Sequence, residues 1–278
     1  MTIGIIQPDI VSNEIEKNLD NCEKLIKSLS GVRIFLLPEM FATGFPATRE
    51  QAEQAETGNI QTWMKRVAQE TNAVVAGTLA VKETVISPET LHAETLPAET
   101  PPTTQENEKI YNRLIWMRPS GEYFTYDKKH LFGAEKIVYQ SGSNIVTINE
   151  SGWNFRLNIC YDLRFPIWCK NRRLYGDTLD YDIGIYLSSW PVPRINVWKA
   201  LLPARAIENI AYTIGVNRTG KDTQGTRYNG QSIVSDVMGN VTLLDKNPQA
   251  YKIVLEKEVL DKWRRHITVA HDWDEFKM

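Results

Sequence analysis

The feature that most constrains the fold is an alternation of short apolar runs and amphipathic segments at the start of the chain. Residues 3–7, 32–37 and 73–81 read as buried strands. The segments between them, 13–29 and 59–70, have the apolar spacing of helices. In the first helix the apolar stripe consists of Ile15, Leu19, Cys22, Ile26 and Leu29. This β-α-β-α-β order predicts a layered α/β domain.

The middle of the chain favours hairpins, and the remainder alternates again. Residues 111–117 and 123–126 flank one turn, and 144–148 and 153–160 flank another, with Pro-Ser-Gly and Ser-Gly at the two turns. Further predicted helices are 166–175, 194–209 and 256–266, and further predicted strands are 183–188, 211–217, 230–235, 241–244 and 251–255. Because no linker divides this pattern, we expect a single domain over residues 1–278.

Two segments depart from the pattern. Residues 83–108 contain four prolines and six glutamates and have little apolar surface to bury. This composition favours an acidic Pro/Thr/Glu-rich surface insertion between two strands over a lid or a partner-binding loop. A short polar tail is expected from about residue 267 onward.

Composition excludes several classes of function. A net charge of −2 gives no reason to expect nucleic acid or an anionic membrane as a partner. No apolar run reaches the length of a membrane span, and residues 1–10 do not resemble a signal peptide. The three cysteines, Cys22, Cys160 and Cys169, lack zinc-ligand spacing and suit a reducing compartment. We therefore expect a cytoplasmic location and no metal.

Cys160 is the candidate nucleophile. The strand before it alternates, which places Phe155, Leu157 and Ile159 on one face and the thiol on the other. Pro166 suits the start of a following helix, and N–H groups near a helix start stabilise a thiolate or an oxyanion. A buried structural cysteine would fit the same pattern, so Cys160 alone leaves both interpretations open.

A thiol nucleophile also needs a base. Of the four histidines, only His130 lies in a plausible site loop, so a Cys–His hydrolase remains an alternative. Glu39 follows a buried strand, where sites form in α/β sheets. Lys128 follows another strand. Asp162 and Arg164 are expected to form an ion pair that anchors the turn after Cys160.

Three motifs in order carry a resemblance to a known family. They are Leu-Pro-Glu-Met-Phe around Glu39, Tyr-Asp-Lys-Lys-His-Leu-Phe around Lys128, and Asn-Ile-Cys-Tyr-Asp-Leu-Arg-Phe-Pro around Cys160. With the later segments 187–191, 202–209 and 215–218, they resemble the nitrilase superfamily of carbon–nitrogen hydrolases. The resemblance covers nearly the whole chain apart from the insertion and the tail. It implies a four-layer α-β-β-α sandwich.

The resemblance also implies a catalytic set. Glu39 matches the general base, Lys128 the catalytic lysine, Cys160 the nucleophile and Glu135 a second glutamate of the site. It implies an oxyanion held by Lys128 and the backbone N–H of Tyr161, and a thioester acyl-enzyme that forms without any cofactor. Substrate contacts are expected from Phe45, Trp190 and Arg194.

Among the branches of the superfamily, the sequence around Glu39 and Cys160 is similar to the bacterial omega-amidases. This similarity implies that the substrate is a small 2-oxo dicarboxylic acid monoamide such as 2-oxoglutaramate, cleaved with water. Alternatives are a deaminated-glutathione amidase, a carbamoylase, or a non-catalytic binding protein that kept the fold. Members of the family usually pair through a helix face, which implies a homodimer.

Overall fold

The computed structural model describes residues 1–54, 57–85, 107–175 and 178–275. The amino-terminal half builds a seven-stranded sheet that the last strand of the chain completes. Its order is β16 (Gln249–Val254), β1 (Thr2–Gln7), β3 (Ile34–Leu36), β5 (Val74–Val85), β6 (Asn107–Met117) and β7 (Tyr123–Asp127), with β4 (Glu53–Gln54) also paired to β5. Strands β1, β3 and β5 are parallel, so their carboxyl ends meet at one edge.

The second half of the chain builds a six-stranded sheet. Its order is β15 (Val241–Leu243), β14 (Ile233–Ser235), β11 (Tyr212–Val216), β10 (Ile183–Leu187), β9 (Trp153–Ile159) and β8 (Thr147–Glu150). Strands β9, β10 and β11 are parallel to one another. A small third sheet joins β13 (Arg227–Asn229), β12 (Thr219–Lys221) and β2 (Asp9–Val11).

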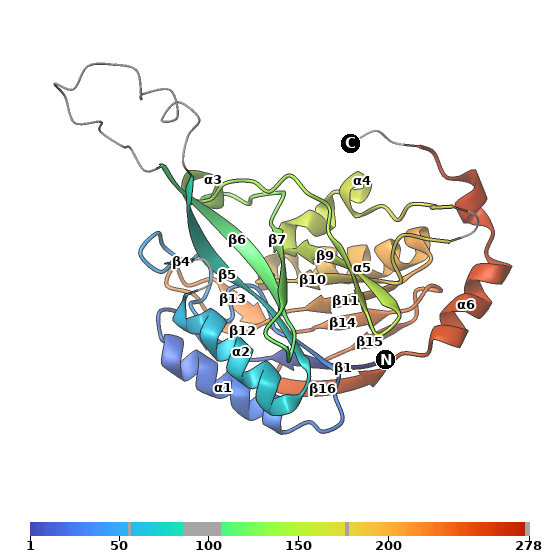
Figure 1. The fold of residues 1–278 in the computed structure, drawn as a ribbon. Coiled ribbons are helices and arrows are strands. Elements are labelled where there is room, and N and C mark those ends of the chain that lie inside the picture. Colours follow the sequence, from blue (N-terminus) through green and yellow to red (C-terminus); the bar gives the residue numbers. More distant parts are fainter. Residues whose placement is uncertain (55–56, 86–106, 176–177, 276–278) are drawn as a thin grey trace, which may run out of the picture.

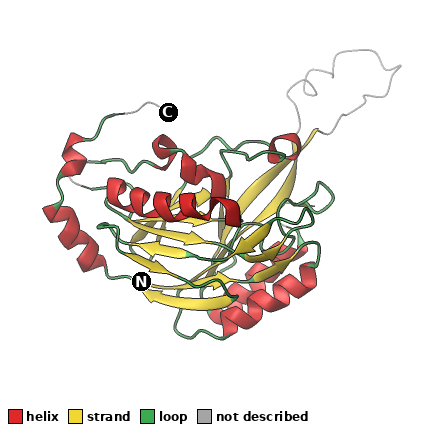
Figure 2. Ribbon diagram, turned by 180° about the vertical axis from the view of Figure 1, so that it is seen from behind, coloured by secondary structure: helices red, strands yellow, loops and turns green. Residues whose placement is uncertain are grey.

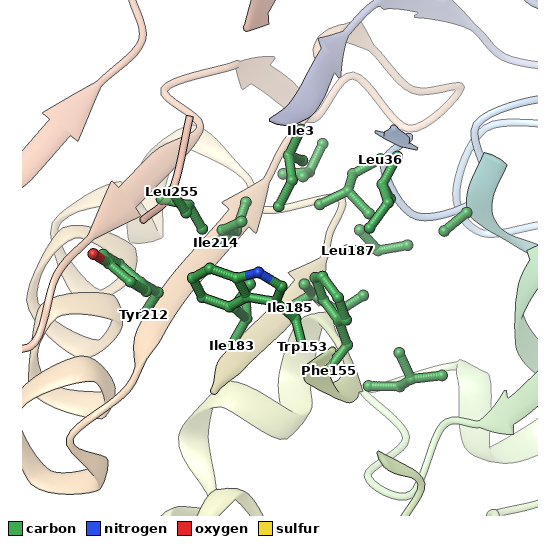
Figure 3. Packing of buried hydrophobic residues seen from close by; sticks show 14 of the residues in the cluster. Ile3, Leu36, Trp153, Phe155, Ile183, Ile185, Leu187, Tyr212, Ile214 and Leu255 are labelled. Carbon is green, nitrogen blue, oxygen red and sulfur yellow. The ribbon is translucent and has the colours of Figure 1, made fainter. Parts of the chain in front are cut away.

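The two large sheets face each other across an apolar core. Ile3 and Leu36 from the first sheet share one buried cluster with Phe155, Ile185 and Ile214 from the second, as Figure 3 shows. Each of these five side chains is completely buried. Full burial of an aliphatic or aromatic side chain contributes about 1.5–3 kcal/mol, so this interface is a principal source of the fold's stability.

Helices cover the outer faces of both sheets (Figures 1 and 2). Helices α1 (Ile15–Lys27) and α2 (Asn59–Thr71) pack on the first sheet through buried residues such as Cys22 and Met64. Helix α5 (Ile195–Asn209) packs on the second through Trp198 and Leu202. The expected α-β-β-α sandwich is confirmed. Helix α6 (Lys257–His266) and the single turn η4 (Val269–Asp272) follow β16.

The helix predicted over residues 166–175 is wrong in its length. Helix α4 covers only Pro166–Cys169. Beyond it, the buried Asn171 side chain donates to the carbonyls of Tyr181 and Asn209, and its carbonyl accepts from the backbone of Tyr181. These bonds hold the chain in an irregular path that apolar spacing does not reveal. The sequence also missed β2, β4, β12 and β13, which have only two or three residues each and show no periodicity.

The two atypical segments are described in part. Strands β5 and β6 pair up to the level of residues 85 and 107, so both ends of the expected insertion continue a ladder. Its central part, residues 86–106, lies outside the described residues. In the expected tail, Ile267 and Trp273 pack against the core, and the Lys170 ammonium lies 3.7 Å from the centre of the Trp273 ring. None of the helices in the described part of the chain could span a membrane.

Candidate active site

Four segments bring polar side chains to the same end of the two sheets. Glu39 lies just beyond β3, and Cys160 follows β9 directly at the start of the short 3-10 helix η2 (Cys160–Arg164). Lys128 follows β7, and Glu135 is the first residue of the short helix α3 (Glu135–Val138). Since β3 runs parallel to β1 and β5, and β9 runs parallel to β10, the carboxyl ends of parallel strands supply the site, as expected for α/β sheets.

Lys128 lies between two carboxylates. Its Nζ is 2.8 Å from Glu39 Oε1 and 2.6 Å from Glu135 Oε2. The three side chains have no solvent-exposed surface. Taking charges out of water is costly unless they are paired and hydrogen-bonded, and here each charge has partners. The structure therefore brings together three of the residues that the sequence proposed.

The electrostatics of the cluster keep its lysine charged. Burial alone would lower the pKa of Lys128, but the charges of Glu135 and Glu39 outweigh burial and raise the pKa well above its usual value. The lysine is therefore an ammonium at neutral pH. The pKa of Glu135 is also raised, mainly by burial and further by the charge of Glu39, against the opposing effect of Lys128. The cluster thus has one cation, which lies between two glutamate side chains.

Backbone N–H groups donate further hydrogen bonds to both glutamate carboxyl groups. Ser189, which follows β10, donates its backbone N–H to Glu39 Oε2 at 2.9 Å and its hydroxyl to the Glu39 carbonyl. Phe132 donates its backbone N–H to Glu135 Oε2 at 2.7 Å. The bonds from Ser189 join the second sheet to the first at the site, so the packing of the sheets determines where Glu39 lies relative to Cys160.

Cys160 occupies a sharp turn at the end of β9. Its φ of 41° lies in the left-handed region, which is unfavourable for a residue with a side chain. Burial and then the charge of Glu39 raise the pKa of the thiol well above its usual value, although Lys128 opposes the shift. The resting thiol is therefore protonated and needs a base to attack a substrate. Met40, next to Glu39, also has a positive φ, of 49°.

The expected ion pair between Asp162 and Arg164 is wrong. Asp162 is completely buried and accepts hydrogen bonds from the Tyr126 hydroxyl and from the backbone N–H of Ile159. Arg164 is exposed and lies 5.8 Å from the centre of the Trp190 ring. The two side chains point in different directions, and the turn is anchored from the protein interior instead.

His130 takes part in that interior anchor. Its backbone N–H and its Nδ1 both lie within 3.0 Å of Asp162 Oδ1. Its ring stacks on Phe165 with centroids 3.6 Å apart. Among the described residues, the side chains that line the cavity at Cys160 do not include His130. This arrangement favours a carboxylate over a histidine as the base for the thiol.

A cavity of about 160 Å³ opens at Cys160. Its walls include each of the remaining sequence-proposed residues, namely Phe45, Tyr161, Trp190 and Arg194, together with Arg164. The cavity is smaller than the roughly 300–1,000 Å³ typical of sites for drug-sized ligands, which favours a small substrate. The Arg194 guanidinium lies 4.7 Å from the centre of the Phe132 ring.

Sequence reasoning missed two parts of the site. Asn112 on β6 donates hydrogen bonds to both glutamates, but a lone polar residue within a strand gave no signal. The turn between β12 and β13 supplies Asp222, Gln224 and Thr226 to the cavity wall, and these short strands were not predicted.

Comparison with known proteins places the chain in a class. The sequence matches the carbon–nitrogen hydrolase family over residues 2–255, and the protein belongs to that family. It is a hydrolase that acts on non-peptide C–N bonds of linear amides, and the resemblance to the nitrilase superfamily is confirmed.

The individual relatives point to amidases. The chain is 32% identical to omega-amidase YafV of Escherichia coli K12, over 100% of this chain and 98% of the relative. It is 28% identical to 2-oxoglutaramate amidase of Bacillus subtilis, over 86% and 84% of the two chains. A CN-hydrolase superfamily protein from Xanthomonas campestris, with an arsenic adduct in its active site, superposes with a TM-score of 0.86. It is 29% identical, over 100% of this chain and 98% of that one.

Proposed function

We propose that the protein hydrolyses the terminal amide of a small 2-oxo dicarboxylic acid monoamide through a thioester on Cys160. The observation that carries this proposal is the buried Glu39–Lys128–Glu135 cluster beside a protonated thiol at a small cavity. The cluster offers a fixed cation and a carboxylate next to the same sulfur. Acyl transfer from an amide needs these two groups together with a nucleophile.

In the proposed reaction Glu39 takes the proton of Cys160 while the sulfur attacks the amide carbon. The oxyanion that develops is stabilised by the Lys128 ammonium and by the backbone N–H of Tyr161. Tyr161 lies in the first turn of η2, where N–H groups have no partner within the helix. Glu39 then passes the proton to the amide nitrogen as the C–N bond breaks. Ammonia departs, and the acyl group remains on Cys160 as a thioester.

Deacylation uses the same groups in a second cycle. Glu39 accepts a proton from water as the oxygen attacks the thioester carbon, and the proton returns to the sulfur as the C–S bond breaks. The products are the carboxylic acid, ammonia and the free thiol, so atoms and charges balance without a redox partner. The role of Glu135 is to fix the position of the Lys128 ammonium through its hydrogen bond and to favour the charged form of the lysine.

The choice of an anionic substrate rests on the mouth of the cavity. Arg164 and Arg194 both line it, and the interactions of their guanidinium groups among the described residues are with aromatic rings, not carboxylates. An arginine without a carboxylate partner suits recognition of a substrate carboxylate. The names of the relatives from Escherichia coli and Bacillus subtilis support the same substrate class.

The test is ammonia release over a matched panel. It comprises 2-oxoglutaramate, 2-oxosuccinamate, glutamine, a carbamoyl amino acid and a nitrile. We expect 2-oxoglutaramate or 2-oxosuccinamate to give the highest kcat/KM. A higher value for the carbamoyl compound or for glutamine would refute the substrate assignment. Hydroxylamine added to the assay should react with the thioester and give a hydroxamate. If no hydroxamate forms while the substrate turns over, the covalent route is refuted.

We also propose a homodimer and a cytoplasmic location. Ile207 on helix α5 is half exposed, and so is Met238, which precedes Gly239, a glycine that lies close to the Ile207 side chain. Exposed apolar surface of this kind favours pairing with a second copy. Light scattering at micromolar concentration should give twice the chain mass, and a monomer would contradict the proposal.

The cytoplasmic location is proposed because a free catalytic thiol suits a reducing compartment.

A further inference from the structure

Two nitrogen atoms bridge the same pair of carboxylates. One is the Lys128 ammonium. The other is Asn112 Nδ2, which donates to Glu39 Oε1 at 2.9 Å and to Glu135 Oε1 at 3.0 Å. Asn112 is completely buried in β6, and its backbone carbonyl accepts a hydrogen bond from the backbone N–H of Lys128. A single residue therefore contacts every charged member of the cluster.

Each glutamate consequently has the same three kinds of donor. Glu39 accepts from Lys128, from Asn112 and from the backbone of Ser189. Glu135 accepts from Lys128, from Asn112 and from the backbone of Phe132. The lysine provides charge, the backbone groups provide fixed direction, and Asn112 is the neutral link between the two carboxylates. Hydrogen bonds to a carboxylate favour its ionised form.

The direction of the Asn112 amide follows from its neighbours. With the nitrogen toward the glutamates, both of its N–H groups are used, and Oδ1 has no hydrogen-bond partner among the described residues. The reverse orientation would set the amide oxygen against two carboxylate oxygens, and both contacts would be repulsive. A buried acceptor without a partner is unfavourable, so the bonds to the carboxylates must compensate for it.

We propose that Asn112 is a positioning residue that holds Glu39 and Glu135 together in their ionised forms, which keeps Glu39 available as the base and Lys128 centred between its partners. This inference rests on the proposed function, because it assigns Asn112 a role through Glu39. Asn112 neither receives a proton nor contacts the substrate. It acts through its two hydrogen bonds, which tie the two side chains to each other and to β6.

The test is the pH dependence of two signals in Asn112→Ala and Asn112→Ser. The signals are kcat/KM for 2-oxoglutaramate and the rate at which iodoacetamide alkylates Cys160. Loss of both N–H donors in Asn112→Ala should move the acidic limb of each profile upward by about one pH unit, since a hydrogen bond to a charged group is worth roughly that much. Asn112→Ser keeps one hydroxyl donor, so its limb should lie between those of Asn112→Ala and wild type.

A matched control separates positioning from simple loss of packing. Asn209 is also completely buried and donates its side-chain amide to the Arg205 carbonyl, away from the cluster. Asn209→Ala should lower the melting temperature without moving either acidic limb. If Asn112→Ala and Asn112→Ser lose activity equally at every pH with unmoved limbs, Asn112 is structural only and the inference fails.

Failure of the inference is distinguishable from failure of the proposed function. Glu39→Gln is run beside the asparagine variants. If Glu39→Gln retains wild-type turnover, the acid–base assignment itself is wrong. If Glu39→Gln is inactive while the Asn112 variants keep the wild-type limb, the assignment stands and only the role of Asn112 is refuted. Should Asn112→Ala not fold, Asn112→Ser carries the same test with a smaller shift.

Discussion

Glu39, Lys128 and Glu135 are completely buried and each has several hydrogen-bond partners, whereas Arg164 and Arg194, at the mouth of the same cavity, are exposed or partly exposed. The two arginines contact aromatic rings and have no ion pair among the described residues. The inner region is fixed by many bonds before a substrate arrives, and the outer region has room to adjust. We therefore expect inner substitutions to affect turnover and stability together, and outer substitutions to affect affinity alone.

The largest effect is expected at the sulfur. Cys160→Ala removes the nucleophile, so ammonia release should fall by several orders of magnitude while the fold is retained. The control is Cys169→Ala, because Cys169 is a buried thiol outside the cavity wall whose Sγ lies 3.1 Å from the Asp162 carbonyl. That variant should keep its turnover. Amidase activity of Cys160→Ala near the wild-type level would end the covalent proposal.

The next effect distinguishes the two candidate bases. Glu39→Gln keeps the size of the side chain and removes the acceptor for the thiol proton, so kcat/KM should fall by roughly 10²–10⁴-fold. His130→Gln removes a ring whose Nδ1 bonds to Asp162, outside the cavity wall, and should cost far less. Steady-state kinetics on both variants decide the point, and the reverse order of effects would assign the base to His130.

A third substitution measures how strongly the inner region depends on its cation. Lys128→Met leaves two buried carboxylates facing each other, which should lower the free energy of unfolding by about 3–5 kcal/mol. Arg66→Met is the matched control, since Arg66 is 45% exposed and pairs with Glu70, which is 44% exposed, on the same helix. It should cost at most about 1 kcal/mol. Urea unfolding at pH 7 compares them, and equal losses would contradict the contrast between buried and exposed charges.

The sequence was sufficient to predict the long strands and helices and to recognise the family motifs. It did not predict the short strands and irregular segments that depend on tertiary contacts. The continuous apolar run at 3–7 appears as β1, and the helix predicted at 13–29 from its clear apolar spacing appears as α1. The predicted helix over 166–175 ended early because the buried Asn171 bonds to distant backbone. No local pattern in the sequence contains that information.

The candidate site shows the same division. Glu39, Lys128 and Cys160 each lie in a distinctive motif after a strand, so sequence reasoning named them. Asn112 became visible only when β6 paired with β7 and placed its amide between two glutamates that are 23 and 73 residues away in the chain. The expected Asp162–Arg164 pair failed because neighbouring residues in a short helix point in different directions, toward the interior and toward the solvent.

The smallest of the predicted effects concerns the mouth. Arg194→Gln removes a charged donor without leaving a buried charge, so the free energy of unfolding should stay within about 0.5 kcal/mol of wild type. KM for 2-oxoglutaramate should rise about 10–100-fold, the value of one hydrogen bond to a charged group. KM for a neutral amide of similar size should not change, because it has no carboxylate to lose.

The control for this variant is Arg33→Gln, since Arg33 is exposed and lies outside the cavity wall. It should match wild type for both substrates. A rise in KM for the neutral amide as well would mean that Arg194 shapes the cavity through its contact with Phe132 and does not read the substrate charge. If KM for 2-oxoglutaramate rises in Arg164→Gln and not in Arg194→Gln, the substrate carboxylate is bound by the more exposed of the two arginines. The first result would remove Arg194 from charge recognition and the second would assign that role to Arg164, and both would leave the roles of Glu39, Lys128 and Glu135 unchanged.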